Sequence, residues 1–148
     1  IKPENLLPWA QSAMEKSYVP HSNRPAGVML RTERGEMSDG CSIETINYDG
    51  LSAVEVALGR LFSAQPWADH KEQLQRISDA VFMTPDLDPT DPSTYVPDAR
   101  SLEWLHKFGS RQTVLRFATP AERIRATHRL ADLLPHAQKL ADMKVYYN

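Results

Sequence analysis

The sequence predicts one α/β domain built in layers, and three observations lead to this prediction. The 148 residues are 41% hydrophobic and 24% charged, a length and composition that suit one compact core, so we expect residues 1–148 to form a single domain. Apolar residues recur at helical spacing in several segments. Short apolar or alternating segments separate the helical ones and indicate strands. Their order, helix, hairpin, helix, strand, helix, strand, helix, is typical of an α/β layered domain.

The N-terminal half predicts a helix, a hairpin and a second helix. Residues 3–18 predict the first helix, because proline suits its first turn and apolar residues follow at helical spacing. Residues 26–47 predict two strands around a tight Arg-Gly turn. Residues 50–64 predict the second helix, and Glu55 lies inside its apolar stripe. The apolar positions are Leu6, Leu7, Ala10, Ala13 and Met14 in the first helix and Leu51, Val54, Leu58 and Phe62 in the second.

The next segments predict a strand, a long loop and a third helix. Residues 79–84 (DAVFMT) form a short apolar run that indicates a strand, and residues 85–98 form a proline-rich loop. A third helix follows and ends near residue 108, with Leu102, Leu105 and Phe108 on its apolar face. Trp104 lies off that face. It is a candidate anchor for a partner or, equally, a residue that packs beneath the C-terminal helix.

The last part of the chain predicts one more strand and a helix. Residues 112–117 (QTVLRF) have the composition of a strand. Residues 119–122 (TPAE) have the form of a capping box with proline at the first helical position, which predicts a helix through Leu134. Pro135 interrupts this helix, and a last helical piece is expected to run toward Tyr146.

Charge and cysteine content narrow the class of protein. The formal net charge is -2 and the charges of both signs are mixed, so nothing indicates a nucleic-acid surface based on bulk positive charge. The single cysteine, Cys41, excludes an internal disulfide and any zinc site that needs two or more thiolates. No apolar run approaches the ~20 residues of a membrane span, so we expect no membrane insertion. We expect an intracellular protein, either cytoplasmic or mitochondrial.

Four segments follow one another in the order and spacing of a known family. They are KSYVPHSNRPAGVML, SDGCSIETINYDGLSAVEVAL, VPDARSLEWLHKFG and LADLLPHA, and they span about 120 residues. In these segments the sequence resembles the cytidine deaminase family. The landmarks of that family are a Tyr-x-Pro-x-Ser-Asn turn, a Gly-Cys-Asn-x-Glu segment, Cys/His-Ala-Glu at one helix start, Pro-Cys-x-x-Cys at another, and a late Leu-Leu-Pro element. The resemblance implies a three-layer α/β/α domain with a central mixed sheet.

The resemblance also implies that the zinc ligands of the family have been replaced. The Cys or His two residues before the catalytic glutamate falls on Ala53, and the cysteines of Pro-Cys-x-x-Cys fall on Asp98 and Ser101. The general acid/base glutamate falls on Glu55 and is retained. The arginine that follows the second cysteine falls on Leu102. Glu55 is thus the remnant of a degenerate catalytic site, and we expect neither a working catalytic set nor a metal.

The sugar-binding segment of the family is at best half retained. Its asparagine falls on Ser42 and its glutamate falls on Glu44, and Arg24 stands where a Phe usually precedes the proline. Ser42 and Glu44 are therefore candidate remnants of a substrate site, although a solvated or strand-pairing Glu44 fits equally well. Glu55 has two interpretations as well. It is either a structural carboxylate that caps the helix start or a residual ligand contact.

The replaced positions remove the chemistry that the family uses. Hydrolytic deamination needs a hydroxide, which zinc deaminases obtain because the metal lowers the pKa of water from roughly 15.7 to about 7. Alanine offers no ligand, a serine hydroxyl is a poor one, and one carboxylate cannot hold the ion. We therefore expect no zinc and no other cofactor. Asp86, Asp88 and Asp91 lack the glycine and terminal glutamate of a calcium loop, so ordinary turn chemistry explains them better.

Three classes of function are compatible with these features. The first is a catalytically inactive deaminase-like protein, a pseudoenzyme, that acts as a structural or assembly subunit in a homo-oligomer, a hetero-oligomer or a larger assembly such as a ribonucleoprotein. The second is a metal-free module that binds a nucleoside, a nucleotide or an RNA base through Ser42, Glu44 and Glu55. The third is an active hydrolase with unusual metal ligation. We favour the first, because the fold signals persist while the ligands are replaced and the family is typically oligomeric.

Overall fold

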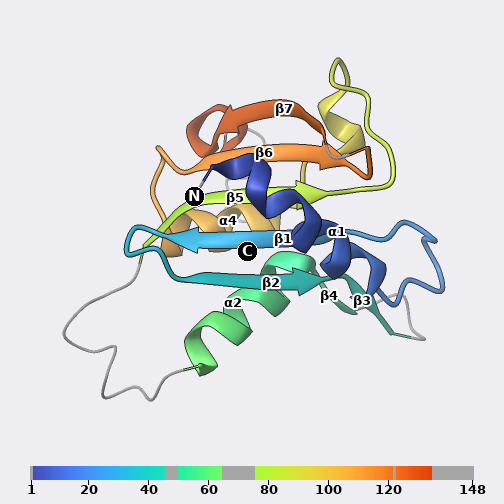
Figure 1. Cartoon of the computed structure of the whole chain (residues 1–148), viewed down its shortest axis with the longest axis horizontal. Coiled ribbons are helices and arrows are strands. Elements are labelled where there is room, and N and C mark those ends of the chain that lie inside the picture. The colour runs from blue at the N-terminus through green and yellow to red at the C-terminus, as the bar shows by residue number, and fades with distance from the viewer. Residues whose placement is uncertain (1, 46–49, 65–75, 122, 135–148) are drawn as a thin grey trace, which may run out of the picture.

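The centre of the molecule is a five-stranded sheet with the strand order β2-β1-β5-β6-β7 (Figure 1). The structure is a computed structural model that describes residues 2–45, 50–64, 76–121 and 123–134. β5 and β6 are parallel and the other neighbouring pairs are antiparallel, so the sheet is mixed, as expected. The strands are β1 (Gly27–Thr32), β2 (Met37–Cys41), β5 (Ile77–Met83), β6 (Val114–Thr119) and β7 (Arg123–Arg129).

Helices cover both faces of the sheet and complete the three α/β/α layers (Figure 1). α1 (Leu7–Glu15) packs on one face, against β1, β2 and β5. α2 (Ala53–Ser63) and α4 (Ala99–Phe108) pack on the other face. None of the helices in the described part of the chain combines the length and apolar character that a membrane crossing requires. The remaining short elements are η1 (Pro3–Leu6), β3 (Ile43–Glu44), β4 (Gly50–Leu51) and η2 (Pro92–Thr94).

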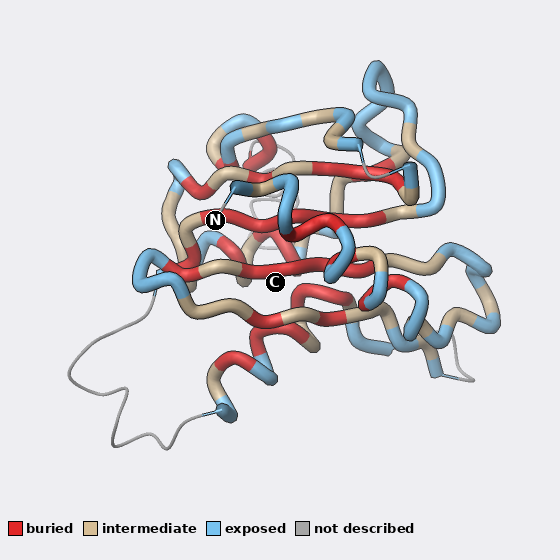
Figure 2. The backbone as a smooth tube through the Cα atoms, viewed as in Figure 1, coloured by how far each residue is buried: buried red, intermediate tan, exposed pale blue. Residues whose placement is uncertain are grey.

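Two apolar clusters lie on opposite faces of the sheet and account for its buried central strands (Figure 2). The larger cluster joins β1, β5 and β6 to α2 and α4, and it includes Leu30, Leu105 and Phe117. The smaller cluster joins the opposite face to α1 and includes Leu7 and Met29. Successive residues of a strand point to opposite faces, so Met29 and Leu30 belong to different clusters. Both faces are covered, which explains why β1 and β5 are apolar almost throughout.

Gly40 on β2 allows the start of α2 to lie directly against the sheet. A Cβ atom at this position would overlap the carbonyl oxygen of Ala53 and the amide nitrogen of Ala57. Gly27 on β1 allows the same close approach of α1. Such contacts with backbone atoms cannot be relieved by moving a side chain. The absence of a side chain at Gly40 therefore fixes where the first turn of α2 lies.

One predicted element is wrong. Instead of a helix from residue 119 to Leu134, Arg123–Arg129 form β7 antiparallel to β6, and helical structure is confined to residues 130–134. The TPAE segment resembles a helix start, yet β7 alternates between exposed and half-buried residues, which is the period of a strand. Pairing with β6 satisfies the backbone groups of β7 that face it and packs Ala126 and Ile124 against the two apolar clusters, contacts that a local helix-start signal does not reveal. The helical piece expected toward Tyr146 lies outside the described residues.

The other predicted elements are found, with shifts of their ends. The second helix begins at Ala53, and Leu51, which was predicted on its apolar face, instead lies exposed on the short strand β4. The strand predicted at 79–84 is Ile77–Met83, and the one predicted at 112–117 is Val114–Thr119. The predicted first helix begins with the 3₁₀ turn η1 before α1. Trp104 lies off the buried face of α4, as predicted, and is half-buried. Its ring stacks on Phe108 with 5.6 Å between ring centroids.

Candidate functional site

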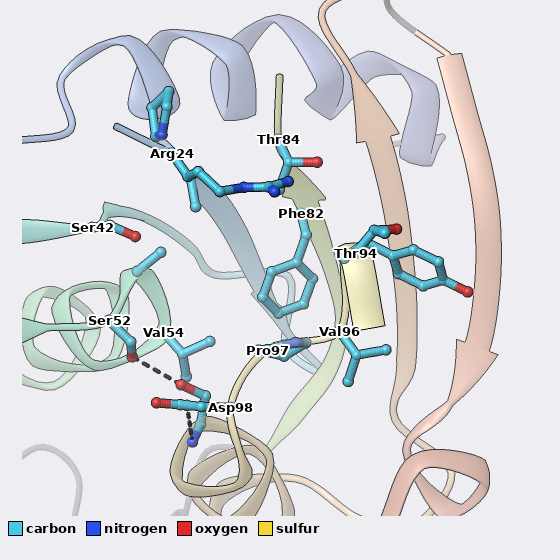
Figure 3. A pocket seen from close by; sticks show the side chains of 15 residues that line it. Arg24, Ser42, Ser52, Val54, Phe82, Thr84, Thr94, Val96, Pro97 and Asp98 are labelled. Atoms are coloured by element: carbon cyan, nitrogen blue, oxygen red, sulfur yellow. Dashed lines mark hydrogen bonds between the residues drawn. The ribbon is translucent and has the colours of Figure 1, made fainter. Parts of the chain in front are cut away.

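The amino ends of α2 and α4 meet at a pocket of about 290 Å³ (Figure 3). Ala53 in the first turn of α2 lines this pocket, as do Asp98 and Ser101 at the start of α4. Ser42, which follows β2, and Arg24, from the loop before β1, line further parts of the wall. The structure thus brings together the three positions at which the resemblance places zinc ligands.

A capping box formed by Ser52 and Glu55 begins α2. Ser52 Oγ accepts a hydrogen bond from the Glu55 N–H at 3.1 Å, and Glu55 Oε1 accepts one from the Ser52 N–H at 3.3 Å. Glu55 Oε2 lies 3.6 Å from Arg100 Nε. Glu55 lines a groove between α2 and α4 and is not among the residues that line the pocket. The structure therefore supports the structural interpretation of this glutamate, which satisfies an amide of the helix start.

Asp98 and Ser101 are also engaged in hydrogen bonds within the protein. Asp98 is the N-cap residue of α4, and its Oδ1 accepts a hydrogen bond from the Ser101 N–H at 2.9 Å. The Ser101 hydroxyl is buried and donates to Ser52 Oγ at 2.9 Å (Figure 3). This bond joins the first turns of α2 and α4 directly. Asp98 and Ser101, at two of the positions where the resemblance places zinc ligands, thus hold the helix starts in place.

These side chains do not fit a zinc ion. A structural or catalytic zinc site needs three or four nitrogen, sulfur or carboxylate ligands at about 2.0–2.3 Å. Ala53 presents a methyl group, the Ser101 hydroxyl is already bonded, and Asp98 supplies one carboxylate that caps a helix. Within the described residues, no three His, Cys, Asp or Glu side chains lie close enough together to hold a metal. At these three positions the pocket therefore presents a methyl group, a bonded hydroxyl and a carboxylate that caps a helix.

Ser42 and Glu44 do not lie at the same site. Ser42 lines the pocket, whereas Glu44 is directed to the loop that follows α1. Glu44 Oε1 accepts hydrogen bonds from the backbone N–H groups of His21 and Ser22 at 3.0 and 3.1 Å. Hydrogen bonds from Ser22, and then the His21 amide, lower the pKa of Glu44 below its ordinary value. Of the two candidate sugar-binding positions, only Ser42 remains at the pocket.

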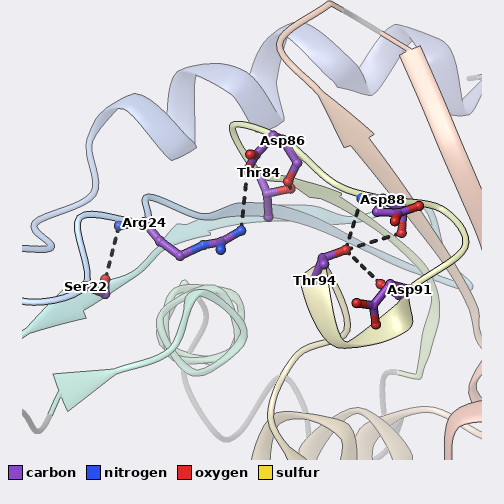
Figure 4. Close-up of polar contacts among 7 residues, drawn as sticks. All are labelled: Ser22, Arg24, Thr84, Asp86, Asp88, Asp91 and Thr94. Atoms are coloured by element: carbon purple, nitrogen blue, oxygen red, sulfur yellow. Dashed lines mark hydrogen bonds and ion pairs between the residues drawn. The ribbon is translucent and has the colours of Figure 1, made fainter.

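Arg24 and residues of the loop after β5 line part of the pocket. Figure 4 shows the polar contacts that Arg24 and this loop make. Arg24 Nη2 lies 3.4 Å from Asp86 Oδ1, in an exposed ion pair that joins two loops far apart in the sequence. In the same loop, Asp88 Oδ1 accepts hydrogen bonds from the backbone and hydroxyl of Thr90, at 2.9 and 2.6 Å. Asp91 Oδ1 does the same for Ser93, at 3.1 and 2.6 Å. These aspartates stabilise turns, in agreement with the interpretation of this segment as turn chemistry.

Aromatic residues form the inner wall, and the sequence analysis had not singled them out. Phe82 from β5 and Tyr95 from the loop before α4 both line the pocket. The Tyr95 ring packs on Phe117 with 4.7 Å between centroids, and its hydroxyl lies 2.9 Å from His128 Nε2 on β7. Burial raises the pKa of Tyr95, and the nearby aspartates of the loop add to this effect. No local sequence pattern joins Tyr95 to His128, because the contact depends on the position of β7.

Ser52 was missed as well, although its signal was present in the sequence. The segment Ser52-Ala-Val-Glu55 has the S-x-x-E spacing of a capping box. The same four residues include Ala53 and Glu55, at which the resemblance places a zinc ligand and the catalytic glutamate. A capping signal thus coincides with a segment that the resemblance assigns to catalysis. In the structure, Ser52 and Glu55 form the capping box.

The fold and the residues around the pocket define the class of protein. A family model described as the cytidine and deoxycytidylate deaminase zinc-binding region matches residues 2–86, more than half of the chain. The chain therefore belongs to the cytidine and deoxycytidylate deaminase family. A search of curated protein sequences gives no significant match.

Solved structures of cytidine deaminases share this fold. The crystal structure of cytidine deaminase from Burkholderia pseudomallei matches with a TM-score of 0.72 and 21% sequence identity, over 91% of this chain and 98% of that one. The enzyme from Mycobacterium tuberculosis matches with a TM-score of 0.67 and 22% identity, over 91% and 96% of the two chains. The enzyme from Mycobacterium leprae matches with a TM-score of 0.66 and 22% identity, over 91% and 98%. At this identity the likeness establishes the fold.

Proposed function

We propose that this chain is a catalytically inactive member of the deaminase family that acts as a structural or assembly subunit of a larger complex. One observation carries the proposal. Ser52, Glu55, Asp98 and Ser101 form hydrogen bonds that cap α2 and α4 and join them, while Ala53 occupies the remaining ligand position. In this proposal, the polar residues at the two helix starts form these hydrogen bonds and do not bind a metal.

The orientation of Glu55 also supports this proposal. A general acid/base must reach its substrate or an attacking water within hydrogen-bond distance. Glu55 Oε1 instead accepts from the Ser52 amide, and Glu55 Oε2 lies near the Arg100 side chain. Glu55 is thus bonded to a helix-start amide and is not among the residues that line the pocket.

The purified chain is expected to contain no stoichiometric zinc and to deaminate neither cytidine nor deoxycytidine. The physical reason is that one methyl, one hydroxyl and one carboxylate cannot form a tetrahedral zinc site. Elemental analysis measures the metal, and the change in ultraviolet absorbance on deamination measures activity. Cytidine deaminase from Mycobacterium tuberculosis, purified and assayed in parallel, is the positive control. Stoichiometric zinc that a chelator removes together with deaminase activity would contradict the proposal.

An apolar surface between α2 and α4 supports the assembly role. A groove of about 310 Å³ between these helices is lined by Leu51, Phe62, Trp104 and Phe108. Leu51 is 51% exposed, and it pairs with Ile43, which is 38% exposed, across the β3–β4 hairpin. The apolar surface therefore continues from the groove onto the hairpin. A continuous exposed apolar surface of this kind is characteristic of protein–protein contacts.

Replacing Trp104 by alanine is expected to reduce assembly more than it reduces folding. Trp104 is half-buried and contributes a large aromatic surface to the groove, and such residues commonly dominate binding energy at interfaces. We expect the Trp104→Ala chain to be missing from the complex isolated under native conditions. We expect the free energy of unfolding of this variant to be only about 1–2 kcal/mol lower than that of the unmodified chain. Size-exclusion chromatography with light scattering measures the assembly, and urea denaturation measures stability.

Trp9 supplies a matched control for this experiment. It is 57% exposed on α1, which covers the opposite face of the sheet. Trp9→Ala removes the same side chain and is expected to leave assembly unchanged. If Trp104→Ala assembles as the unmodified chain does, Trp104 is not an anchor of the complex.

A metal-free binding module is the second candidate function. The pocket of about 290 Å³ offers the Phe82 ring as a surface for stacking a base and Ser42 as a hydrogen-bonding group. Such a module would bind a nucleoside, a nucleotide or an RNA base without converting it. A rise in melting temperature with cytidine, uridine or a mononucleotide would favour this function over a purely structural one.

A further inference from the structure

Two of the described residues that line the pocket are charged, and they lie on different sides of it (Figure 3). Arg24 belongs to the loop before β1, whereas Asp98 is the residue that caps the start of α4. In the view of Figure 3, the Phe82 ring lies between these two side chains. The pocket therefore offers a cationic group, an aromatic ring and an anionic group to a bound molecule.

Hydrogen bonds hold the backbone of the loop that carries Arg24. The Arg24 N–H donates to Ser22 Oγ at 3.2 Å, and Glu44 accepts from the N–H groups of His21 and Ser22. Asn23 has a φ of 53°, in the left-handed region that asparagine adopts more readily than most residues. The loop thus fixes the point from which the Arg24 side chain extends, while that side chain itself is 58% exposed.

The ion pair between Arg24 and Asp86 can be exchanged for another anion. It is a single contact of 3.4 Å, and the Asp86 side chain is 86% exposed. In the described part of the chain Arg24 makes no other ion pair. Exposed ion pairs of this kind contribute little to stability, and a guanidinium has five N–H donors. A stronger acceptor, such as a phosphate or a carboxylate held inside the pocket, can therefore take the place of Asp86.

We propose that the pocket binds a planar ring compound that carries an anionic group, and that Arg24 selects this compound over its neutral counterpart. The ring contacts Phe82, and the anionic group pairs with Arg24. Asp98 repels an anion, so hydrogen-bond donors of the ligand are directed toward Asp98. This inference deepens the second candidate function, metal-free binding, and rests on it, because it names the class of ligand and the residue that selects it.

The size of the pocket favours a small ligand. Its volume of about 290 Å³ is at the lower end of the roughly 300–1,000 Å³ that is usual for small-molecule pockets. Such a volume suits one ring, with the charged group placed near the exposed side chain of Arg24. Arg24 is also the only cationic residue among the described residues that line the pocket. A preference for an anionic ligand therefore depends on this one side chain.

Calorimetric titration of the full chain with two matched pairs of compounds tests the proposal. One pair is cytidine monophosphate and cytidine, and the other is 4-aminobenzoate and 4-aminobenzamide. The members of each pair share a ring and an amino group and differ in charge. We expect the anionic member of at least one pair to bind about five- to tenfold more tightly than the neutral member. The pair that shows this preference identifies the anionic group as a phosphate or a carboxylate.

Two substitutions with opposite expected effects assign the preference to Arg24. Arg24→Gln is expected to reduce the preference to less than about twofold and to leave binding of the neutral compound unchanged. Asp86→Asn removes the competing carboxylate and is expected to strengthen binding of the anionic compound about two- to threefold. Arg34→Gln, at an exposed arginine in the turn between β1 and β2, is the matched control and is expected to keep the preference. Thermal melting shows that each variant folds.

Several outcomes would overturn the proposal. Equal binding of both members in each pair, a preference that survives Arg24→Gln, or an equal loss of preference in Arg34→Gln would overturn this inference alone. If none of the four compounds binds, the second candidate function is overturned with it. The proposed inactive subunit stands in all these cases, because zinc content and deaminase activity are measured separately. Zinc and activity in the unmodified chain would overturn that function whatever the four compounds do.

Discussion

A chain carrying Ala53→Cys, Asp98→Cys and Ser101→Cys is expected to bind about one zinc ion, whereas we expect the unmodified chain to bind none. The three positions line one pocket at the starts of α2 and α4, so three thiolates would converge on the same space. Losing the Asp98 cap and the Ser101–Ser52 hydrogen bond costs about 1 kcal/mol each. Thiolate zinc sites in peptides gain about 10–16 kcal/mol, so metal binding outweighs the loss.

Zinc uptake is measured by elemental analysis and by the release of metal when the thiolates are modified. The variant with only Asp98→Cys and Ser101→Cys is the matched control, because two thiolates leave the zinc site one protein ligand short. It is expected to hold zinc far more weakly. A triple variant that folds and takes up no metal would show that the backbone around the pocket no longer has the arrangement that a metal needs.

We expect the zinc-loaded triple variant to show little or no deaminase activity. Glu55 is committed to the Ser52 amide and lies near Arg100, and Leu102 offers no polar group to the site. Loss of groups around a metal typically costs 10–100-fold in affinity or activity. Metal content is therefore the decisive measurement for this variant.

Gly40→Ala is expected to lower the free energy of unfolding by about 3 kcal/mol. The added Cβ would overlap backbone atoms of Ala53 and Ala57, and relief requires α2 to move away from β2. Ala53 lines the pocket, so the substitution also displaces one wall of the candidate site. A loss of this size lowers the melting temperature by roughly 6–12 °C for a chain of this length.

Gly59 on α2 provides a control with the opposite sign. A Cβ atom at Gly59 would meet nothing within 4 Å, and alanine is the better helix former. Gly59→Ala is therefore expected to raise the free energy of unfolding by about 0.5–1 kcal/mol. Urea denaturation measures both variants. A Gly40→Ala chain as stable as the unmodified one would show that α2 does not pack on β2 as closely as described.

The errors of the sequence analysis came from segments in which a local signal competed with a distant contact. The TPAE segment carries a genuine helix-start signal, but the residues after it pair with β6 and form a strand. Ser52-Ala-Val-Glu55 matched both a capping box and a catalytic remnant, and only the position of Arg100 and the pocket distinguished them. Tyr95 and His128 carry no local pattern that would join them.

The sequence by itself determined the layered α/β class and most of the helices and strands, and it predicts that the zinc ligands of the family have been replaced. These features depend on residue identity and on periodicity along the chain, both of which are local. Only the tertiary structure decided that Glu55 and Glu44 accept hydrogen bonds from backbone N–H groups. It also decided that Asp98 and Ser101 join two helix starts. It decided as well that Arg123–Arg129 form a strand that pairs with β6. The reason is physical, because hydrogen bonds and strand pairing between distant segments depend on how the core brings those segments together.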